Sequence, residues 1–287
     1  MISLILDTDI GDDVDDAFAL AFAARHPAIR LCAVTTVLGD TRWRAALSLR
    51  LLDELGVGDV PVAAGEPDGG IEGIPLSGDV VLPQGRDDPR RDPRSAIDLM
   101  ADMIATAPDP VWLAIIGPAT NAAALLADRP EALDRLAGIV MMGGRHDPNN
   151  PREHNFGADP AAAAAVCNSG RRVRVGDYLV TSQAKLRRDD LARVRRAPGI
   201  GASLGLMLET YLDRRNRDWT SMYDPAVLTL ALGEQFLRLG LTSRRAEVES
   251  GQVWFRVASE ATELRIAASI GAAAFRRELL DVIGSNG

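Results

Sequence analysis

Six aspartates crowd into ten residues near the start of the chain: Asp7, Asp9, Asp12, Asp13, Asp15 and Asp16. They follow an apolar segment and precede a helical one, and Gly11 between them allows a tight turn. Helix N-capping and the helix dipole account for one or two acids at such a place. Six would repel one another, and closely spaced carboxylate oxygens are the ligands that Ca²⁺ prefers. The turn therefore predicts a metal site.

The position of this acidic turn also favours a functional site. In an open α/β sheet, ligands bind in the crevice beyond the carboxyl ends of the strands, and the turn follows the expected strand at residues 2–6. Metal-dependent phosphohydrolases of the haloacid dehalogenase type also begin with a strand and an Asp-x-Asp motif. They need Thr or Val two residues after the second Asp, where this chain has Gly11, so a phosphohydrolase is the weaker alternative.

Short β-rich apolar segments alternate with segments of helical periodicity, which is the pattern of βαβ units in a parallel sheet. The expected strands are residues 2–6, 31–37, 60–63, 111–116, 139–142 and 173–178. The expected helices are residues 15–25, 43–55, 96–105, 122–127 and 159–168. We therefore expect an α/β fold: a single domain over residues 1–287, with an open, mostly parallel Rossmann-like sheet of five or six strands and flanking helices.

Two regions depart from this alternation. Residues 65–93 are rich in Gly, Pro and Asp without a sustained period, which predicts a lid over a site. A small helical and hairpin addition is expected in the C-terminal part, with helices at residues 189–196, 204–216 and 225–237 and a hairpin at residues 246–257.

The composition excludes several classes of protein. The 287 residues carry a formal net charge of −8, which disfavours nucleic acid or an anionic membrane as a partner and tolerates a bound cation. Cys32 and Cys167 lack CxxC spacing, which predicts free thiols. Because the sequence also shows no basic leader and no apolar run of membrane-spanning length, we expect a cytoplasmic protein.

The acidic turn, with the sequence DTDIGDDVDDA at residues 7–17, resembles the signature of the nucleoside hydrolases. Seven further blocks follow in that family's order: VTTVLGD (34–40), PVAAG (61–65), GPATN (117–121), MGG (142–144), EHN (153–155), DP (159–160) and DP (224–225). The resemblance spans nearly the whole chain. It implies Ca²⁺-dependent hydrolysis of the N-glycosidic bond of ribonucleosides to free base and ribose, by a homodimer or homotetramer.

Matched position by position, the family's pattern also implies roles for single residues. The metal ligands would be Asp9, Asp16, the backbone carbonyl group of Thr120, and Asp224. The substrate contacts would be Asp15, Asp40, Asn149, Asn150, Glu153 and Asn155, with Asn149 or Asn150 on the side of the 5′-hydroxyl group. The catalytic residues would be Asn155, Tyr223 and Asp9, which would deprotonate a Ca²⁺-bound water.

Several of these residues have structural alternatives. Thr120 could simply cap a helix, and Asp224 before Pro225 could be a plain N-cap. Glu153 and Asn155 could be solvated in their loop, whereas the histidines, His154 among them, are expected on the surface or in packing.

Four departures from the family's pattern bear on function. Asp12 and Asp13 are extra, which makes Asp13 an alternative to Asp15 and a further candidate ligand of the metal. Asp40 stands where many members have Asn, and the 65–93 segment lacks the usual His-Gly-x-x-Gly run. Tyr223 replaces a His that helps to protonate the leaving base, and a phenol with a pKa of about 10 titrates poorly at neutral pH. A nucleoside- or ribose-binding homologue without turnover is therefore the main alternative.

Overall fold

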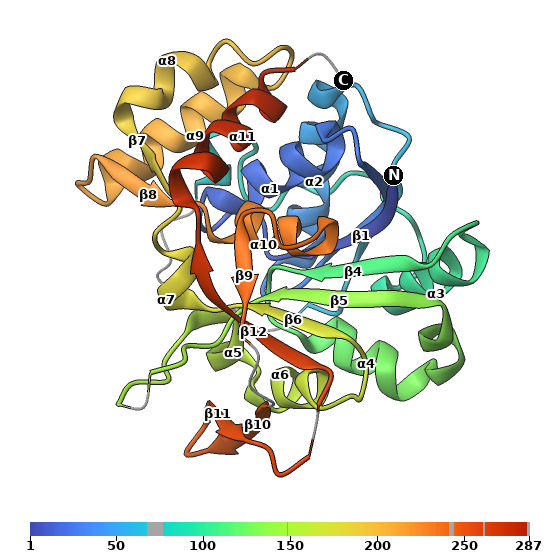
Figure 1. Cartoon of the computed structure of the whole chain (residues 1–287). Helices are drawn as coiled ribbons and strands as arrows, with labels where there is room; N and C mark the ends of the chain where they lie inside the picture. Colours follow the sequence, from blue (N-terminus) through green and yellow to red (C-terminus); the bar gives the residue numbers. More distant parts are fainter. Residues whose placement is uncertain (68–76, 148, 241–243, 261, 286–287) are drawn as a thin grey trace.

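A computed structural model describes residues 1–67, 77–147, 149–240, 244–260 and 262–285 of the chain. Within these residues, eight strands form an open sheet in the order β3-β2-β1-β4-β5-β6-β12-β9 (Figure 1). The strands are β1 (Ile2–Thr8), β2 (Ile29–Thr36), β3 (Val62–Ala64), β4 (Val111–Ile115), β5 (Leu136–Met142), β6 (Val173–Gly176), β9 (Leu237–Leu239) and β12 (Leu264–Ile270). Every neighbouring pair is parallel except β12 and β9, which confirms the expected α/β fold.

Helices cover both faces of the sheet. The helices are α1 (Asp15–Arg25), α2 (Thr41–Leu55), α3 (Ala96–Thr106), α4 (Thr120–Asp128), α5 (His154–Ala158), α6 (Pro160–Cys167), α7 (Tyr178–Thr181), α8 (Leu191–Val194), α9 (Gly201–Arg214), α10 (Tyr223–Leu232) and α11 (Ala272–Ile283). Successive residues of a strand point to opposite faces. Leu4 and Leu6 of β1 accordingly enter the core shared with α1, α2 and α10, whereas Ile5 enters the core shared with α3, α4 and α6.

Part of the C-terminal region differs from the expectation. Strand β12 is an additional parallel strand, and a small pair of strands, β7 (Lys185–Arg187) and β8 (Trp219–Ser221), lies outside the main sheet. The helix expected over residues 225–237 is wrong at its end, because α10 stops at Leu232, Gly233 has a φ of 138°, and β9 follows. The expected hairpin is confirmed as β10 (Arg244–Glu249) and β11 (Gln252–Val257), which pair antiparallel.

The strand order places one edge of the sheet in a special position. The chain leaves β1 for β2 on one side and later enters β4 on the other, so the direction of winding reverses between β1 and β4. Crevices at such a reversal bind ligands in open α/β sheets. The acidic turn between β1 and α1 lies at this point.

The segment predicted as a lid is only partly described, because residues 68–76 of it lie outside the described residues. Near it, the backbone N–H groups of Ser77 and Gly78 donate to the Gly11 carbonyl oxygen at 2.8 and 2.9 Å, beside the acidic turn. The lid stays a prediction.

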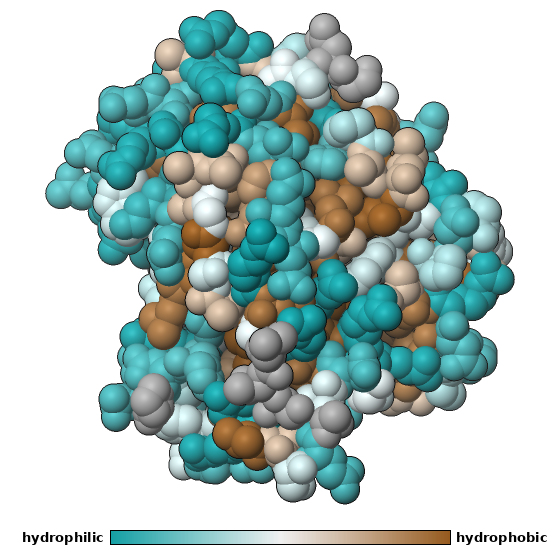
Figure 2. All heavy atoms as spheres, viewed as in Figure 1, coloured by the Kyte–Doolittle hydropathy of each residue, from teal (hydrophilic) through white to brown (hydrophobic). Residues whose placement is uncertain are grey.

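Hydrophilic side chains cover much of the molecular face in Figure 2, with hydrophobic atoms visible between them. No helix of the described residues has the length and apolar character needed to cross a membrane.

Candidate active site

A cavity of about 290 Å³ opens at the carboxyl end of β1. Its walls come from segments far apart in the chain: the acidic turn, the ends of β4 and β5, residues 153–155, the first residues of α7 and α10, and Arg215 after α9. The cavity therefore gathers most of the residues that the sequence analysis singled out. It lies where the sheet topology places a ligand.

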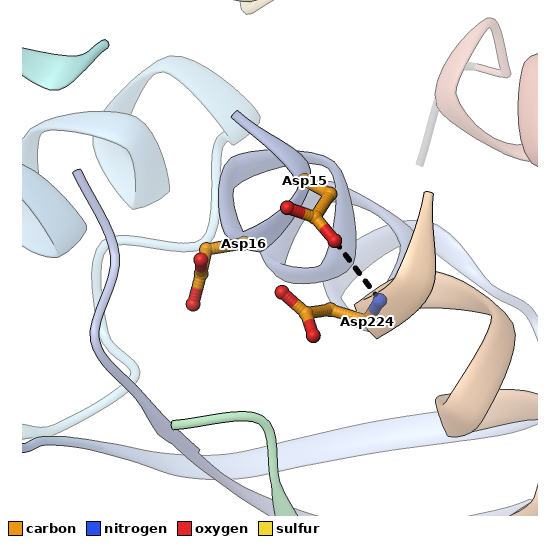
Figure 3. Close-up of side chains that lie close together, drawn as sticks. All are labelled: Asp15, Asp16 and Asp224. Atoms are coloured by element: carbon orange, nitrogen blue, oxygen red, sulfur yellow. Dashed lines mark hydrogen bonds between the residues drawn. The ribbon is translucent and has the colours of Figure 1, made fainter. Parts of the chain in front are cut away.

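Three carboxylates form the centre of this cavity. Asp15 and Asp16 begin α1, and Asp224 lies in the first turn of α10, and each contributes an oxygen within 4.8 Å of the other two (Figure 3). The backbone N–H of Asp224 donates to Asp15 Oδ2 at 3.2 Å, which joins the two helix starts. All three side chains are buried.

The electrostatics of this cluster are unfavourable without a cation. Burial raises the pKa of Asp15, Asp16 and Asp224 well above the usual range, and repulsion from neighbouring aspartates raises these pKa values further. In the described part of the chain, none of the three forms an ion pair with an arginine or a lysine. Buried carboxylates of this kind fit a hard divalent cation such as Ca²⁺, which takes oxygen ligands.

Arg44 of α2 holds the acidic turn in place. Its guanidinium lies 2.9 Å from Asp12 Oδ2, and it donates to the carbonyl oxygens of Leu38 at 2.7 Å and Ile10 at 3.0 Å, and to that of Asp9. Asp12, one of the two extra residues of the turn, therefore has a structural partner in Arg44. Nothing in the sequence around Arg44 distinguished it from other helical arginines.

Asp13, the other extra residue, also has partners in the protein. Its Oδ2 accepts from the Tyr211 hydroxyl at 2.8 Å, and its Oδ1 accepts from the backbone N–H of Val14 at 2.7 Å. Asp13 lines the cavity but is not one of the three carboxylates that cluster within 4.8 Å. Its assignment as a metal ligand stays a prediction.

Asp9 lines the same cavity, at the end of β1. Burial raises its pKa to about 6, and the nearby Arg44 opposes this rise. Gly117 makes room for it, because a Cβ there would lie 3.0 Å from both the Asp9 backbone nitrogen and Asp9 Oδ1. His154 Nε2 lies 3.8 Å from Asp9 Oδ2. His154 is exposed, as expected, and it also lines the cavity.

Glu153 and Asn155 also line the cavity, and neither is simply solvated. Glu153 caps α5, accepting from the backbone N–H groups of Asn155, Phe156 and Gly144 at 3.0, 2.9 and 2.9 Å. Burial raises the pKa of Glu153. Asn155 Nδ2 donates to carbonyl oxygens at the ends of β4 and β5, at 2.8 and 3.2 Å, which fixes the amide against the cavity floor.

Tyr223 lines the cavity next to Asp224, and its ring stacks on that of Tyr178. Burial raises the pKa of Tyr223 above its usual range, so the phenol stays protonated at neutral pH. Tyr178 and Arg215 are lining residues that the sequence analysis missed. Neither belongs to a motif, so no local signal pointed to them.

Four expected site residues do not line the cavity: Asp40, Thr120, Asn149 and Asn150. The Asp40 side chain caps α2 by accepting from the Trp43 N–H at 3.0 Å, and the Thr120 hydroxyl donates to Asp159 Oδ2 at 2.7 Å. The Asn149 backbone N–H donates to Asp147 Oδ1 at 2.9 Å, and Asn150 Oδ1 accepts from the Arg152 N–H at 3.2 Å. Their functional roles, including that of the Thr120 carbonyl group, stay predictions.

Comparisons with known proteins show the family of the chain. The sequence profile of the inosine-uridine preferring nucleoside hydrolase family matches residues 4–277. The pyrimidine-specific ribonucleoside hydrolase RihA of Shewanella baltica is 33% identical over 247 residues, covering 80% of this chain and 77% of that protein. RihA of Salmonella arizonae is 31% identical over 250 residues, covering 80% of this chain and 79% of that protein.

A solved structure supports the fold independently. The purine-preferring ribonucleoside hydrolase from Gardnerella vaginalis superposes with a TM-score of 0.83 at 24% sequence identity, and 98% of each chain is covered. The profile match includes the acidic turn, and both sequence matches cover 80% of the chain. The chain therefore belongs to the inosine-uridine preferring nucleoside hydrolase family, and it is a hydrolase of the N-glycosyl bond of ribonucleosides.

Proposed function

We propose that the cavity at the end of β1 is the active site for Ca²⁺-dependent ribonucleoside hydrolysis, with Asp9 as the general base. The observation that carries this proposal is the convergence of Asp15, Asp16 and Asp224, whose buried oxygens lie within 4.8 Å of one another. Such a cluster is unfavourable alone and favourable around a divalent cation.

Asp16 and Asp224 would hold the ion, together with Asp9 and the Thr120 carbonyl group. Asp13 is a further candidate, although Tyr211 and the backbone already occupy its oxygens. When bound, Ca²⁺ supplies a positive charge that acidifies a nearby water and attracts the vicinal ribose hydroxyl groups.

The protein's own residues would orient the ribose. Asp15 would accept hydrogen bonds from the vicinal hydroxyl groups. Glu153 and Asn155 would bind the sugar from the start of α5, where two backbone carbonyl groups fix the Asn155 amide. Asp40 and either Asn149 or Asn150 would reach the sugar only after a local rearrangement, because none of them lines the cavity. A ribose held at both ends reacts faster, because its reacting carbon is already positioned.

The charge of the cavity suits the transition state of this reaction. Breaking the bond between C1′ and the base leaves an oxocarbenium-like sugar, which the cavity's carboxylates stabilise electrostatically. Asp9 would accept the proton of the attacking water as its oxygen bonds to C1′. The base departs toward the wall formed by Tyr178 and Tyr223.

The relatives named pyrimidine-specific make uridine and cytidine the first substrates to examine. An assay of base release should compare these with inosine, guanosine, adenosine and the 2′-deoxynucleosides, in Ca²⁺ and in chelator. We expect Asp9→Ala to lower kcat/KM on the order of 1000-fold, since both a base and a ligand are removed. The 2′-deoxy substrates should be poorer because they lack a hydroxyl group for Asp15.

Asp109→Ala is the matched control, because Asp109 is exposed and precedes the amino end of β4, whereas the cavity lies at the carboxyl end. It should leave kcat/KM within about twofold of wild type. Full activity in Asp9→Ala, or in the presence of chelator, would contradict the proposal. A wild type that binds nucleosides without releasing base would instead favour the binding-protein alternative. Assembly into a homodimer or homotetramer and a cytoplasmic location stay predictions.

A further inference from the structure

The two residues that lengthen the acidic turn are each bound by a side chain from a different helix. Asp12 pairs with Arg44 of α2 at 2.9 Å, and Asp13 Oδ2 accepts from the Tyr211 hydroxyl group of α9 at 2.8 Å. These partners lie 32 and 198 residues further along the chain. The added residues therefore connect the turn to two helices that are remote in the sequence.

Asp13 has a fixed donor on each of its carboxylate oxygens. Besides Tyr211 on Oδ2, the backbone N–H of Val14 donates to Oδ1 at 2.7 Å. Val14 is the N-cap residue of α1 and offers no side-chain cap. Two donors on different oxygens hold the carboxylate in one orientation. Asp13 therefore links α9 to the start of the helix that carries Asp15 and Asp16.

The backbone of the turn is held as well. The N–H groups of Ser77 and Gly78 donate to the Gly11 carbonyl oxygen. The Ser77 hydroxyl group donates to the Asp13 carbonyl oxygen at 3.1 Å, and Ser77 is completely buried. The conformation of the turn thus depends on contacts with α2, with α9 and with the residues that follow the predicted lid.

Tyr211 is suited to hold this turn. The residue is buried, and a hydrogen bond from a hydroxyl group to a carboxylate is stronger than one between neutral groups. The Tyr211 ring lies beside Arg215, whose guanidinium carbon is 5.5 Å from the ring centroid. The ring and the hydroxyl group thus make separate contacts, so Tyr211→Phe removes the second and keeps the first.

The carboxylate cluster needs such support. Asp15, Asp16 and Asp224 repel one another, and the first two directly follow the turn. Because repulsion favours conformations with the carboxylates further apart, groups outside the cluster must restrain the turn. Substituting a residue that holds metal ligands in place commonly weakens metal binding roughly 10- to 100-fold.

We propose that Asp13 is a tether rather than a metal ligand, and that Tyr211 is a positioning residue that acts through it. The hydrogen bond between them holds the acidic turn in the conformation that presents Asp16 to Ca²⁺ and Asp15 to the ribose. This role rests on the proposed function, since it exists only if the cavity binds Ca²⁺. Both oxygens of Asp13 keep the donors that they have in the structure.

A tether and a ligand at Asp13 predict opposite responses to Tyr211→Phe. For a tether, loss of the hydroxyl group loosens the turn, and we expect the Kd for Ca²⁺ to rise on the order of 10-fold. For a ligand, the same substitution frees the Asp13 carboxylate for the ion, and the Kd stays the same or falls. Calorimetric titration of the metal-free protein with Ca²⁺ measures the Kd, well below the Tm of every variant. A loss of stability alone leaves this Kd unchanged.

Asp13→Ala and the double variant show whether Tyr211 acts through Asp13. In the Asp13→Ala background, adding Tyr211→Phe should change the Kd by less than about twofold, because the bond between the two residues is already lost. Glu209→Gln is the matched control, since Glu209 also lies on α9 but accepts from Arg195 at 2.6 Å and not from a residue of the turn. It should keep the Kd within about twofold of wild type.

An unchanged or lower Kd in Tyr211→Phe would overturn the inference. A further loss of affinity in the double variant, or an equal rise of the Kd in Glu209→Gln, would overturn it too. A wild type that does not bind Ca²⁺ would instead refute the proposed function.

Discussion

The carboxylates of the cavity and the half-buried Asp92, which precedes α3, differ in which group balances their charge. Asp92 accepts from Arg94 Nη2 at 2.6 Å, and this hydrogen bond holds the pKa of Asp92 below its usual range. Burial and mutual repulsion raise the pKa of Asp15, Asp16 and Asp224 instead. Asp92 is thus paired with an arginine, whereas the three clustered aspartates of the cavity form no ion pair with an arginine among the described residues.

Asp12 shows that burial alone does not make this difference. It lies in the acidic turn and is buried like its neighbours, yet Arg44 pairs with it at 2.9 Å. Where the chain provides no arginine, a buried carboxylate must take up a proton or bind an external cation. The difference between the two regions therefore supports our proposal that Asp15, Asp16 and Asp224 surround a metal ion.

The largest expected effect comes from Asp224→Asn, which neutralises one carboxylate of the cluster without changing its shape. We expect kcat/KM to fall roughly 1000-fold, because a ligand and its charge are lost. We expect Ca²⁺ to raise the Tm of wild type in calorimetry, and this rise should disappear in the variant. In chelator the variant should be more stable than wild type, because less charge is buried. A variant that keeps the wild-type response to Ca²⁺ would remove Asp224 from the metal site.

A smaller effect is expected from Asp7→Asn, measured without metal. Burial raises the pKa of Asp7 from its ordinary 3.8 to about 7, opposed by hydrogen bonds from Asn121 and Thr35. Between these pH values the folded state keeps a proton that the unfolded state has lost. The free energy of unfolding therefore falls as the pH rises through this window, by at most about 1.4 kcal/mol per pH unit.

Asp7→Asn should flatten that slope, because asparagine does not titrate. Urea unfolding in chelator between pH 5 and pH 8 measures it, and a difference between wild type and variant that stays constant across this range would contradict the expectation. The slope is the readout because the amide also places a donor where Asp7 Oδ2 has no partner among the described residues. That cost does not vary with pH.

The smallest effect is expected from Asp92→Asn, at the half-buried partner of Arg94. The folded-state pKa of Asp92 is lowered, so its stabilising contribution is present above the unfolded pKa and is lost as the pH falls. At neutral pH the variant should lose less than about 1 kcal/mol of unfolding free energy, because solvent reaches Arg94 and screens this ion pair. Its sign is opposite to that of Asp224→Asn in chelator. A stabilised Asp92→Asn would remove the contrast between the two regions.

Local sequence was sufficient for the parts of the fold that repeat along the chain. The strands near residues 2–6, 111–116 and 139–142 and the helix Asp15–Arg25 follow the predicted periodicity closely. Strand β12 and helix α11 were not predicted. The residues of β12 do not show by themselves that this strand pairs with β6. Hydrophobic patterning reports that a segment is buried, and not against which partner.

The acidic turn and its place after the first strand were determined by the sequence, because their spacing is set by neighbouring residues along one chain. The tertiary structure alone decided which of those aspartates meet Asp224, which lies more than two hundred residues further on and joins Asp15 through its backbone N–H. It also decided that Arg44 pairs with Asp12, and that Tyr178 stacks on Tyr223. The physical reason is that such contacts depend on how the helices pack against the parallel sheet near the carboxyl ends of its strands. No local spacing encodes that packing.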